Sequence, residues 1–362
     1  MKKRIALLLA TVLAVGTLAT ACGGNSGNND STVKVGIGVH TDFAYGSKDF
    51  GASNDKDGNP KNGVAQADIH VAAVMLDANG KIIDVVVDAI QIAGEVDATG
   101  KIVTDKSTAF QTKREKGTEY GMVKYGSTPI GKEWYEQVDF FESFCIGKTA
   151  AEVAAIALED QTATDSAILA GCTIKVYGIQ QAIVRACENA KWEGASATDT
   201  LSLGMTGTIY DYNYTYDATP ATAEAAAKDG MICASSTIAA TTTNKDGKLT
   251  CVVIDAIQAK STFDTTGKIT TDMTAEKEPV TKYNQHDKYG MVEWGPKPPE
   301  AIGKEWDYQA EFYMNYVLSA GKVAATNDSG KPTDDALLAG CTIVITDMNK
   351  AVEKALNPQY GY

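Results

Sequence analysis

Alternating apolar and polar residues mark two pairs of β-strands along the chain. In the first pair, residues 68–76 and 82–88 are rich in β-branched side chains and are separated by the turn sequence DANG at 77–80. The second pair, 237–243 and 249–255, is separated by NKDG at 244–247. Asparagine and glycine tolerate the positive φ angles of tight turns, so both patterns predict antiparallel hairpins. A further turn, DATG at 97–100, predicts one more strand after it.

Helical patterns follow the strands. Trp134, Val138, Phe141 and Cys145 recur at helical spacing, which predicts a helix over 133–145. A shorter helix is expected at 150–158, then a short strand after residue 173, and closing helices at 179–189 and 349–356. Because strands come first and helices after, we expect an α+β fold in which a mostly antiparallel sheet is flanked by helices.

The chain repeats itself once. The sequence DAIQ at 88–91 returns at 255–258, and DATGKI at 97–102 returns as DTTGKI at 264–269, both shifted by 167 residues. YGMV, IGKEW and LAGCTI, which start at 120, 130 and 169, return with shifts of 169 to 172. We therefore expect two tandem copies of one domain, at 32–190 and 201–362, joined by a linker at 191–200.

Composition and charge exclude several classes of protein. The chain has 362 residues, of which 44% are hydrophobic, and a formal net charge of −13. The composition is that of a globular protein, and the negative charge argues against nucleic-acid binding. There are three histidines in scattered positions and no CxxC pair, so we expect no metal site.

The first residues have the plan of an export signal. Three basic residues precede an apolar stretch over 5–21, and LATA at 18–21 leads into Cys22 and a Gly/Asn/Ser-rich tether over 22–31. The small residues before the cysteine resemble a bacterial lipobox, which implies a signal peptide at 1–21 and a lipid on Cys22. The alternative is an ordinary secretory signal with a cysteine nearby. Removal of the three basic residues would change the net charge from −13 to −16. We expect an extracytoplasmic protein that is lipid-anchored to the cell membrane.

Six cysteines remain once Cys22 is set aside. An even number in an exported protein permits disulfides, but none of the spacings favours a pairing. We expect mostly buried thiols.

No catalytic constellation recurs in the two halves. None of the three histidines has a counterpart in the other half, since His70 aligns with Thr237. The GIG sequence at 36–38 lacks the third glycine of a dinucleotide fingerprint, and the paired Asp334 and Asp335 are typical of a solvated helix start. We therefore name no catalytic residue.

One segment with a candidate chemical role is present in both halves. TDSAILAGCTI at 164–174 matches TDDALLAGCTI at 333–343, and in both a threonine follows three small residues. Small residues let a bulky group approach the backbone, and a hydroxyl can be esterified. The alternative is a tight Ala-Gly turn before a strand, with threonine chosen for its β propensity.

Together with the D-x-x-G-K-I-x-x-V hairpin at 77–85 and the GKEW segments, this motif resembles the FMN-binding domain family. That family includes flavin-carrying subunits of the sodium-pumping NADH:quinone oxidoreductase and Rnf complexes, and cell-surface flavoprotein lipoproteins of extracellular electron transfer. The resemblance implies FMN joined through its phosphate to Thr173 and Thr342 by a flavin transferase, with Gly171 and Gly340 as the motif glycines. Two positions depart from the family's Ser/Thr-Gly-Ala-Ser/Thr pattern. Ala170 and Ala339 replace its first Ser/Thr, and Cys172 and Cys341 replace its alanine.

The resemblance further implies a cell-surface electron carrier, rather than an enzyme with its own substrate, that takes electrons from a membrane quinone or dehydrogenase. Two alternatives stay open: an envelope scaffold that kept the fold without the flavin, and an extracellular flavin-dependent reductase. Four residues recur that could stack on a flavin or pack a core: Tyr120, Trp134, Tyr289 and Trp306. For the tryptophans we favour the core. Lys113 and Lys282 could face a flavin phosphate, but we expect them to be solvated at the surface.

Overall fold

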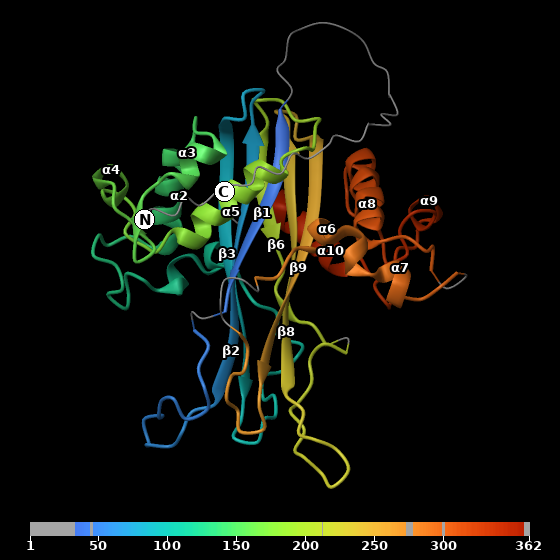
Figure 1. Ribbon diagram of the computed structural model, residues 1–362. Helices are drawn as coiled ribbons and strands as arrows, with labels where there is room; N and C mark the ends of the chain where they lie inside the picture. Colours follow the sequence, from blue (N-terminus) through green and yellow to red (C-terminus); the bar gives the residue numbers. More distant parts are fainter. Residues whose placement is uncertain (1–32, 44–45, 212, 273–277, 299–300, 358–362) are drawn as a thin grey trace, which may run out of the picture. The chain divides into compact units, whose positions relative to one another are not determined.

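The computed structural model describes residues 33–43, 46–211, 213–272, 278–298 and 301–357 (Figure 1), and these residues belong to one compact unit. The expected signal peptide, the tether and Cys22 lie outside the described residues. Within the described ranges, no helix is both long enough and apolar enough to cross a membrane.

The first half is built on a three-stranded antiparallel sheet in the order β1-β2-β3. Its strands are β1 (Lys34–Asp42), β2 (Gly63–Leu76) and β3 (Ile82–Val96). In the β2–β3 turn, the Asp77 carboxylate accepts hydrogen bonds from the backbone N–H groups of Asn79 and Lys81, and Gly80 takes a φ of +73°. The DANG signal therefore predicted this hairpin correctly.

The second half contains an antiparallel sheet of similar layout. It comprises β6 (Thr200–Met205), β7 (Thr208–Ile209), β8 (Gly230–Thr243) and β9 (Leu249–Phe263). Strands β6, β7 and β9 all pair with β8. The two long hairpins share one register, because Gly63 lies opposite Val96 in the first and Gly230 lies opposite Phe263 in the second. The prediction of a mixed helix-and-strand protein with antiparallel sheets is thus confirmed.

The strands differ from the prediction in length and number. β2 begins five residues before the expected start and β3 runs eight residues past the expected end, since the alternation of buried and more exposed side chains continues on both strands. No further strand follows the turn at 97–100 in the described residues. There the chain makes a single bridge from Val96 to Ile102, and the Thr104 hydroxyl accepts the Glu95 N–H in place of a backbone carbonyl.

Helices follow the strands in both halves. In the first half these are α1 (Lys113–Lys116), η1 (Gly117–Tyr120), α2 (Trp134–Cys145), α3 (Ala150–Ala154), α4 (Ser166–Leu169) and α5 (Tyr177–Asn189), with a small hairpin, β4 (Leu158–Glu159) and β5 (Thr162–Ala163), before α4. In the second half they are α6 (Lys282–Gln285), η3 (His286–Tyr289), α7 (Met291–Trp294), α8 (Trp306–Ala320), α9 (Asp335–Leu338) and α10 (Thr346–Leu356).

The long helices match the predictions and the short elements do not. α2, α5 and α10 occupy the expected segments. The helix expected at 150–158 ends at Ala154, because the Gln180 side chain donates hydrogen bonds to the Val153 and Ile156 carbonyls and so ends the series of helical backbone hydrogen bonds. The short strand expected after residue 173 is reduced to one bridge between Lys175 and Thr162.

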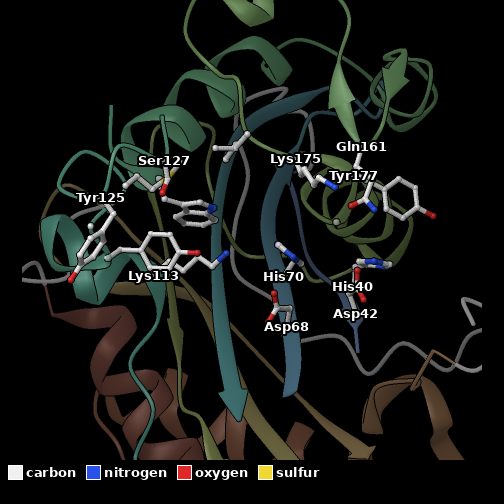
Figure 2. Close-up of a pocket in the computed structure, with 16 residues that line it drawn as sticks. His40, Asp42, Asp68, His70, Lys113, Tyr125, Ser127, Gln161, Lys175 and Tyr177 are labelled. Carbon is white, nitrogen blue, oxygen red and sulfur yellow. The ribbon is translucent and has the colours of Figure 1, made fainter. Parts of the chain in front are cut away.

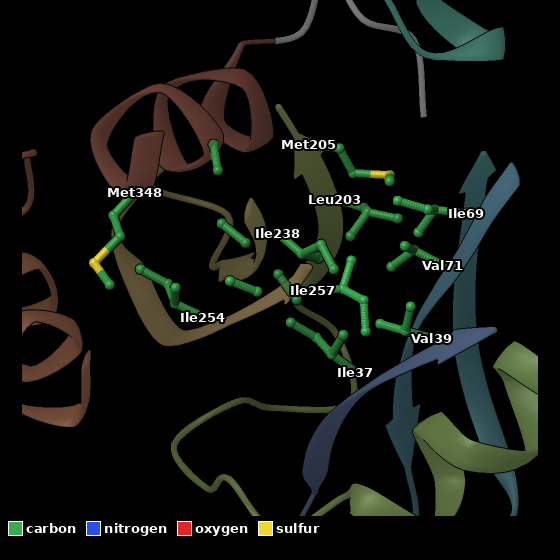
Figure 3. Close-up of a cluster of buried hydrophobic side chains, with 14 of the residues drawn as sticks. Ile37, Val39, Ile69, Val71, Leu203, Met205, Ile238, Ile254, Ile257 and Met348 are labelled. Atoms are coloured by element: carbon green, nitrogen blue, oxygen red, sulfur yellow. The ribbon is translucent and has the colours of Figure 1, made fainter. Parts of the chain in front are cut away.

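The two halves pack on each other through a shared apolar core (Figure 3). One cluster of buried side chains includes Ile37 and Ile69 from the first sheet together with Leu203 and Ile257 from the second. The contacts between the halves are also reciprocal. Asp217 accepts the Ile102 N–H and Asp49 accepts the Ile269 N–H, both at 2.9 Å.

The six cysteines between Cys145 and Cys341 are free and buried, as expected. Trp134 and Trp306 are also buried, at 4% and 5% exposure, in agreement with core packing, and Trp134 in addition lines a cavity.

Candidate functional site

The two candidate threonines follow identical local structures. Asp165 caps α4 by accepting the Ala167 N–H, and Asp334 caps α9 by accepting the Ala336 N–H, which explains why an aspartate starts each segment. Each helix lasts a single turn and closes on a bend at its glycine. Asp335 is exposed, as expected for a solvated helix start.

A buried glutamine holds each threonine. Gln137 Oε1 accepts hydrogen bonds from Thr173 N at 2.8 Å and Thr173 Oγ1 at 3.1 Å. Gln309 Oε1 does the same for Thr342, at 2.9 and 3.3 Å. The sequence analysis missed both glutamines, although each stands three residues after the tryptophan of a repeated GKEW segment. Both threonines are half-buried, and the hydrogen bond to the glutamine fixes the direction of each hydroxyl.

The motif glycines are required by packing. A Cβ atom built on Gly171 would lie 2.3 Å from the Phe140 ring, and one on Gly340 would lie 2.2 Å from the Phe312 ring. The neighbouring Cys172 and Cys341 are buried, and burial raises the pKa of both thiols to about 11. They are therefore packing groups rather than nucleophiles. Ala170 and Ala339 are exposed.

A cavity of about 390 Å³ lies in the first half; Ile174 and Lys175, which follow Thr173 in the sequence, line it, whereas Thr173 itself is not among its lining residues. Its walls carry the rings of Tyr120, Tyr125, Trp134 and Tyr177. Figure 2 shows Lys113 and Tyr125 on one side of the cavity and Lys175 and Tyr177 on the other, with strand β2 between them. This size is typical of a site for a small molecule.

Four titratable side chains from β1 and β2 form the floor of this cavity. His40 pairs across the strands with His70, and Asp42 pairs with Asp68. Burial, together with the nearby charge of Lys113, lowers the pKa of His70 well below its usual value. Its buried Nδ1 has no hydrogen-bond partner in the described part of the chain. Burial raises the pKa of Asp68, which accepts hydrogen bonds from Gln66 and Gln91.

Lys113 also faces the cavity, and the expectation of a solvated surface lysine is wrong for it. Lys113 is 7% exposed, and its Nζ lies 5.0 Å from the Tyr120 ring and 5.2 Å from the Trp134 ring. Thr112 positions the lysine by capping α1 through a box with Glu115. The cation stays close to the cavity because two aromatic faces stabilise it there.

The corresponding groups of the second half are different. Where the first half pairs its two histidines, the second half pairs Thr206 with Thr237. Where the first half pairs its two aspartates, the second half pairs Thr208 with Ser235. Lys282, the counterpart of Lys113, is half-buried with Nζ 4.9 Å from the Tyr289 ring, and burial lowers its pKa to about 8. The two halves therefore share the threonine arrangement but not the chemistry beside it.

A residue of the second half reaches the edge of the cavity. Glu278 lies 3.1 Å from His40 Nδ1, accepts the Thr41 N–H at 2.8 Å and forms an ion pair with Arg185. Burial raises the pKa of Glu278, but the hydrogen bonds from His40 and Arg185 outweigh it and hold the pKa at about 2. Across the described ranges, no three His, Cys, Asp or Glu side chains are arranged to hold a metal ion.

Comparison with known proteins identifies a partial relative. No model of a known protein family matches the chain, and no solved structure matches it. One curated protein that it resembles is the chlorophenol reductase of Desulfitobacterium hafniense, with 34% identity over 96 residues. The match covers 24% of this chain and 29% of that protein, so the chain spans less than a third of the relative's length.

Proposed function

We propose that the protein is an electron carrier with FMN attached through a phosphoester to Thr173 and Thr342, and that its two halves are copies of one FMN-binding-like domain. The observation that carries the proposal is the matched pair of threonines. In each half a buried glutamine orients the hydroxyl, and a glycine packs on an aromatic ring beside it.

The residues beside Thr173 fit a flavin. The cavity has aromatic walls for a planar ring, and its floor offers donors and acceptors to the polar edge of that ring. The unpartnered Nδ1 of His70 would gain a hydrogen bond from a ligand there. Lys175, which pairs with Asp160 at 3.4 Å, would contribute positive charge toward the phosphate. When bound, FMN would supply the redox chemistry, so the chain itself needs no catalytic nucleophile.

The setting of this carrier is the outer face of the cell membrane. The lipobox at 18–22 supports a lipid anchor on Cys22, and a flavin transferase would form the two esters. A covalent bond prevents loss of the cofactor outside the cell, where it cannot be replaced. Electrons would pass from a membrane quinone or dehydrogenase to extracellular acceptors. The partial relative is named as a reductase, which agrees with a redox role.

A second candidate is an extracellular flavin-dependent reductase. It is favoured by the open cavity of the first half, whose histidines and aspartates could exchange protons with a bound acceptor. A carrier of electrons alone would not need them.

The test is flavin fluorescence in a denaturing gel, after co-expression with a flavin transferase. We expect a fluorescent band at the mass of the protein, weaker in Thr173→Ala and in Thr342→Ala and absent from the double variant. A band of unchanged intensity in the double variant would overturn the assignment of the threonines. Turnover of a defined acceptor would distinguish the reductase from the carrier.

A further inference from the structure

A second cavity lies in the second half of the chain. Its volume is about 710 Å³, and neither Thr173 nor Thr342 is among its lining residues. Three aromatic side chains from separate segments line it: Phe43 after β1, Tyr214 before β8, and Tyr289 in η3. A cavity of this size with aromatic walls is typical of a site for a small organic molecule.

One face of β9 forms the polar floor of this cavity. Gln258, Lys260 and Thr262 alternate along the strand and line the cavity, whereas Ala259 and Ser261 between them are buried on the opposite face. Two residues apart on one face of a strand are separated by about 7 Å. The Gln258 amide and the Lys260 amine can therefore both contact one bound group.

The amide of Gln258 has a donor to spare. In the first half the equivalent Gln91 lies opposite Asp68 and donates to its carboxylate at 3.2 Å. In the second half Gln258 lies opposite Ser235, and its buried Nε2 has no hydrogen-bond partner in the described part of the chain. Because buried donors in native proteins are almost always paired, this nitrogen indicates a ligand that supplies an acceptor.

Two lysines add positive charge to the same cavity. Lys260 and Lys288 are exposed, and neither forms an ion pair with a carboxylate of the described residues. Lys260 Nζ lies 4.2 Å from the Tyr214 ring, which holds the amine at the cavity wall. Among the described lining residues the opposing charge comes from one carboxylate, Asp272. The cavity therefore favours an anion.

The lysines are particular to the second half. The shifts of 167 and 169 residues that relate the repeated segments place Ala93 and Glu119 at the positions of Lys260 and Lys288. The first half thus has one neutral and one negative residue where the second half has two positive ones, so the shared fold does not require these charges.

We propose that this cavity is a binding site for one planar aromatic anion, of the class of the aromatic carboxylates. The acidic group accepts a hydrogen bond from Gln258 Nε2 and pairs with Lys260 and Lys288. The ring system packs among the three aromatic walls. No residue of the two candidate ester segments takes part, so the inference does not depend on the proposed flavin.

The experiment is isothermal titration calorimetry of 2-naphthoate with the full chain, produced without a flavin transferase. We expect 2-naphthoate to bind at least tenfold more tightly than two relatives, the neutral 2-naphthylmethanol and the non-aromatic cyclohexanecarboxylate. Absence of 2-naphthoate binding would overturn the proposal. Equal binding of the alcohol would refute the role given to the lysines, and equal binding of cyclohexanecarboxylate that given to the rings.

A double variant places the ligand in this cavity. Lys260→Ala with Lys288→Glu copies the first half and should remove one bound naphthoate per chain. Lys245→Ala with Lys322→Glu makes the same change of charge at exposed positions that do not line the cavity, and should bind as the parent protein does. Equal binding by the two double variants would contradict the proposal.

Gln258→Met separates binding from folding. It should weaken naphthoate binding at least threefold without lowering the thermal unfolding temperature, because the amide that it removes has no partner in the free protein. A lower unfolding temperature with unchanged affinity would show that Gln258 serves the fold instead.

A comparison with flavin-loaded protein separates this inference from the proposed function. The chain co-expressed with a flavin transferase should bind naphthoate as the unmodified chain does. Loss of binding in that form alone would show that flavin fills the cavity, and would overturn the separate site while supporting the flavin. Naphthoate binding to a chain that the transferase leaves unmodified would support this site and contradict the esters.

Discussion

Replacing Gln137 by methionine removes the amide that holds Thr173 while keeping nearly the same volume. Gln137 is 0% exposed, and its amide takes part in four hydrogen bonds. Two of these satisfy backbone groups, the Thr173 N–H and the Lys132 carbonyl. The other two involve the hydroxyls of Thr128 and Thr173, which can turn toward water.

The expected loss of stability follows from the two backbone groups. A buried polar group that loses its partner costs about 1–3 kcal/mol, and methionine introduces little strain in place of glutamine. Because Thr173 is half-buried, water can recover part of the loss on that side. We therefore expect Gln137→Met to reduce the free energy of unfolding by about 2–4 kcal/mol.

Urea unfolding followed by circular dichroism measures this change, with Gln111→Met, at an exposed position, as the control. Flavin attached at Thr173 should fall in the same variant, since the hydroxyl loses its fixed direction. A loss below about 1 kcal/mol, less than one buried unsatisfied group should cost, would show that Gln137 does not hold the threonine segment.

Four further predictions follow from other contacts. Arg114→Met should destabilise the protein by about 3–5 kcal/mol in urea unfolding, because it leaves the buried carboxylate of Glu142 without its ion-pair partner. The double variant Arg114→Tyr with Glu142→Met copies Tyr283 and Met314 of the second half and should recover most of this loss. No recovery would contradict the match between the halves. Glu278 has a folded pKa of about 2, below its ordinary value of 4.5, so its contribution to folding stability is complete above pH 4.5 and is lost as the pH falls toward 2. Glu278→Gln should therefore lose less stability than the parent protein between pH 6 and pH 3. An equal loss would refute the assignment. Gly171→Ala should lower stability by about 1–3 kcal/mol in thermal unfolding, because the added Cβ meets the Phe140 ring, and an unchanged melting temperature would speak against close packing there. Cys22→Ser should move the protein from the membrane fraction to the soluble extract, whereas retention in the membrane would argue against the lipid anchor.

Local signals predicted those parts of the fold that depend on local physics. The DANG turn and the helix at Trp134 need only a few neighbouring residues, and both were predicted correctly. The strand expected after Gly100 and the helix expected to reach residue 158 were wrong because distant side chains intervene, as Gln180 does at the end of α3.

The candidate site was predictable only in part. The repeated threonines were found from the sequence, and the structure gives them matching surroundings. Gln137 and the cavity were missed, because a glutamine on a helix carries no chemical signature until its partner is known. Lys113 was assigned to the surface because sequence spacing does not reveal the two rings that enclose it.

The central claim is tested most directly by the intact mass of the protein after co-expression with a flavin transferase. The account predicts a mass increased by two FMN groups, each less one water, with one group lost in Thr173→Ala and one in Thr342→Ala. An unmodified mass, or additions that persist when both threonines are replaced, would contradict it.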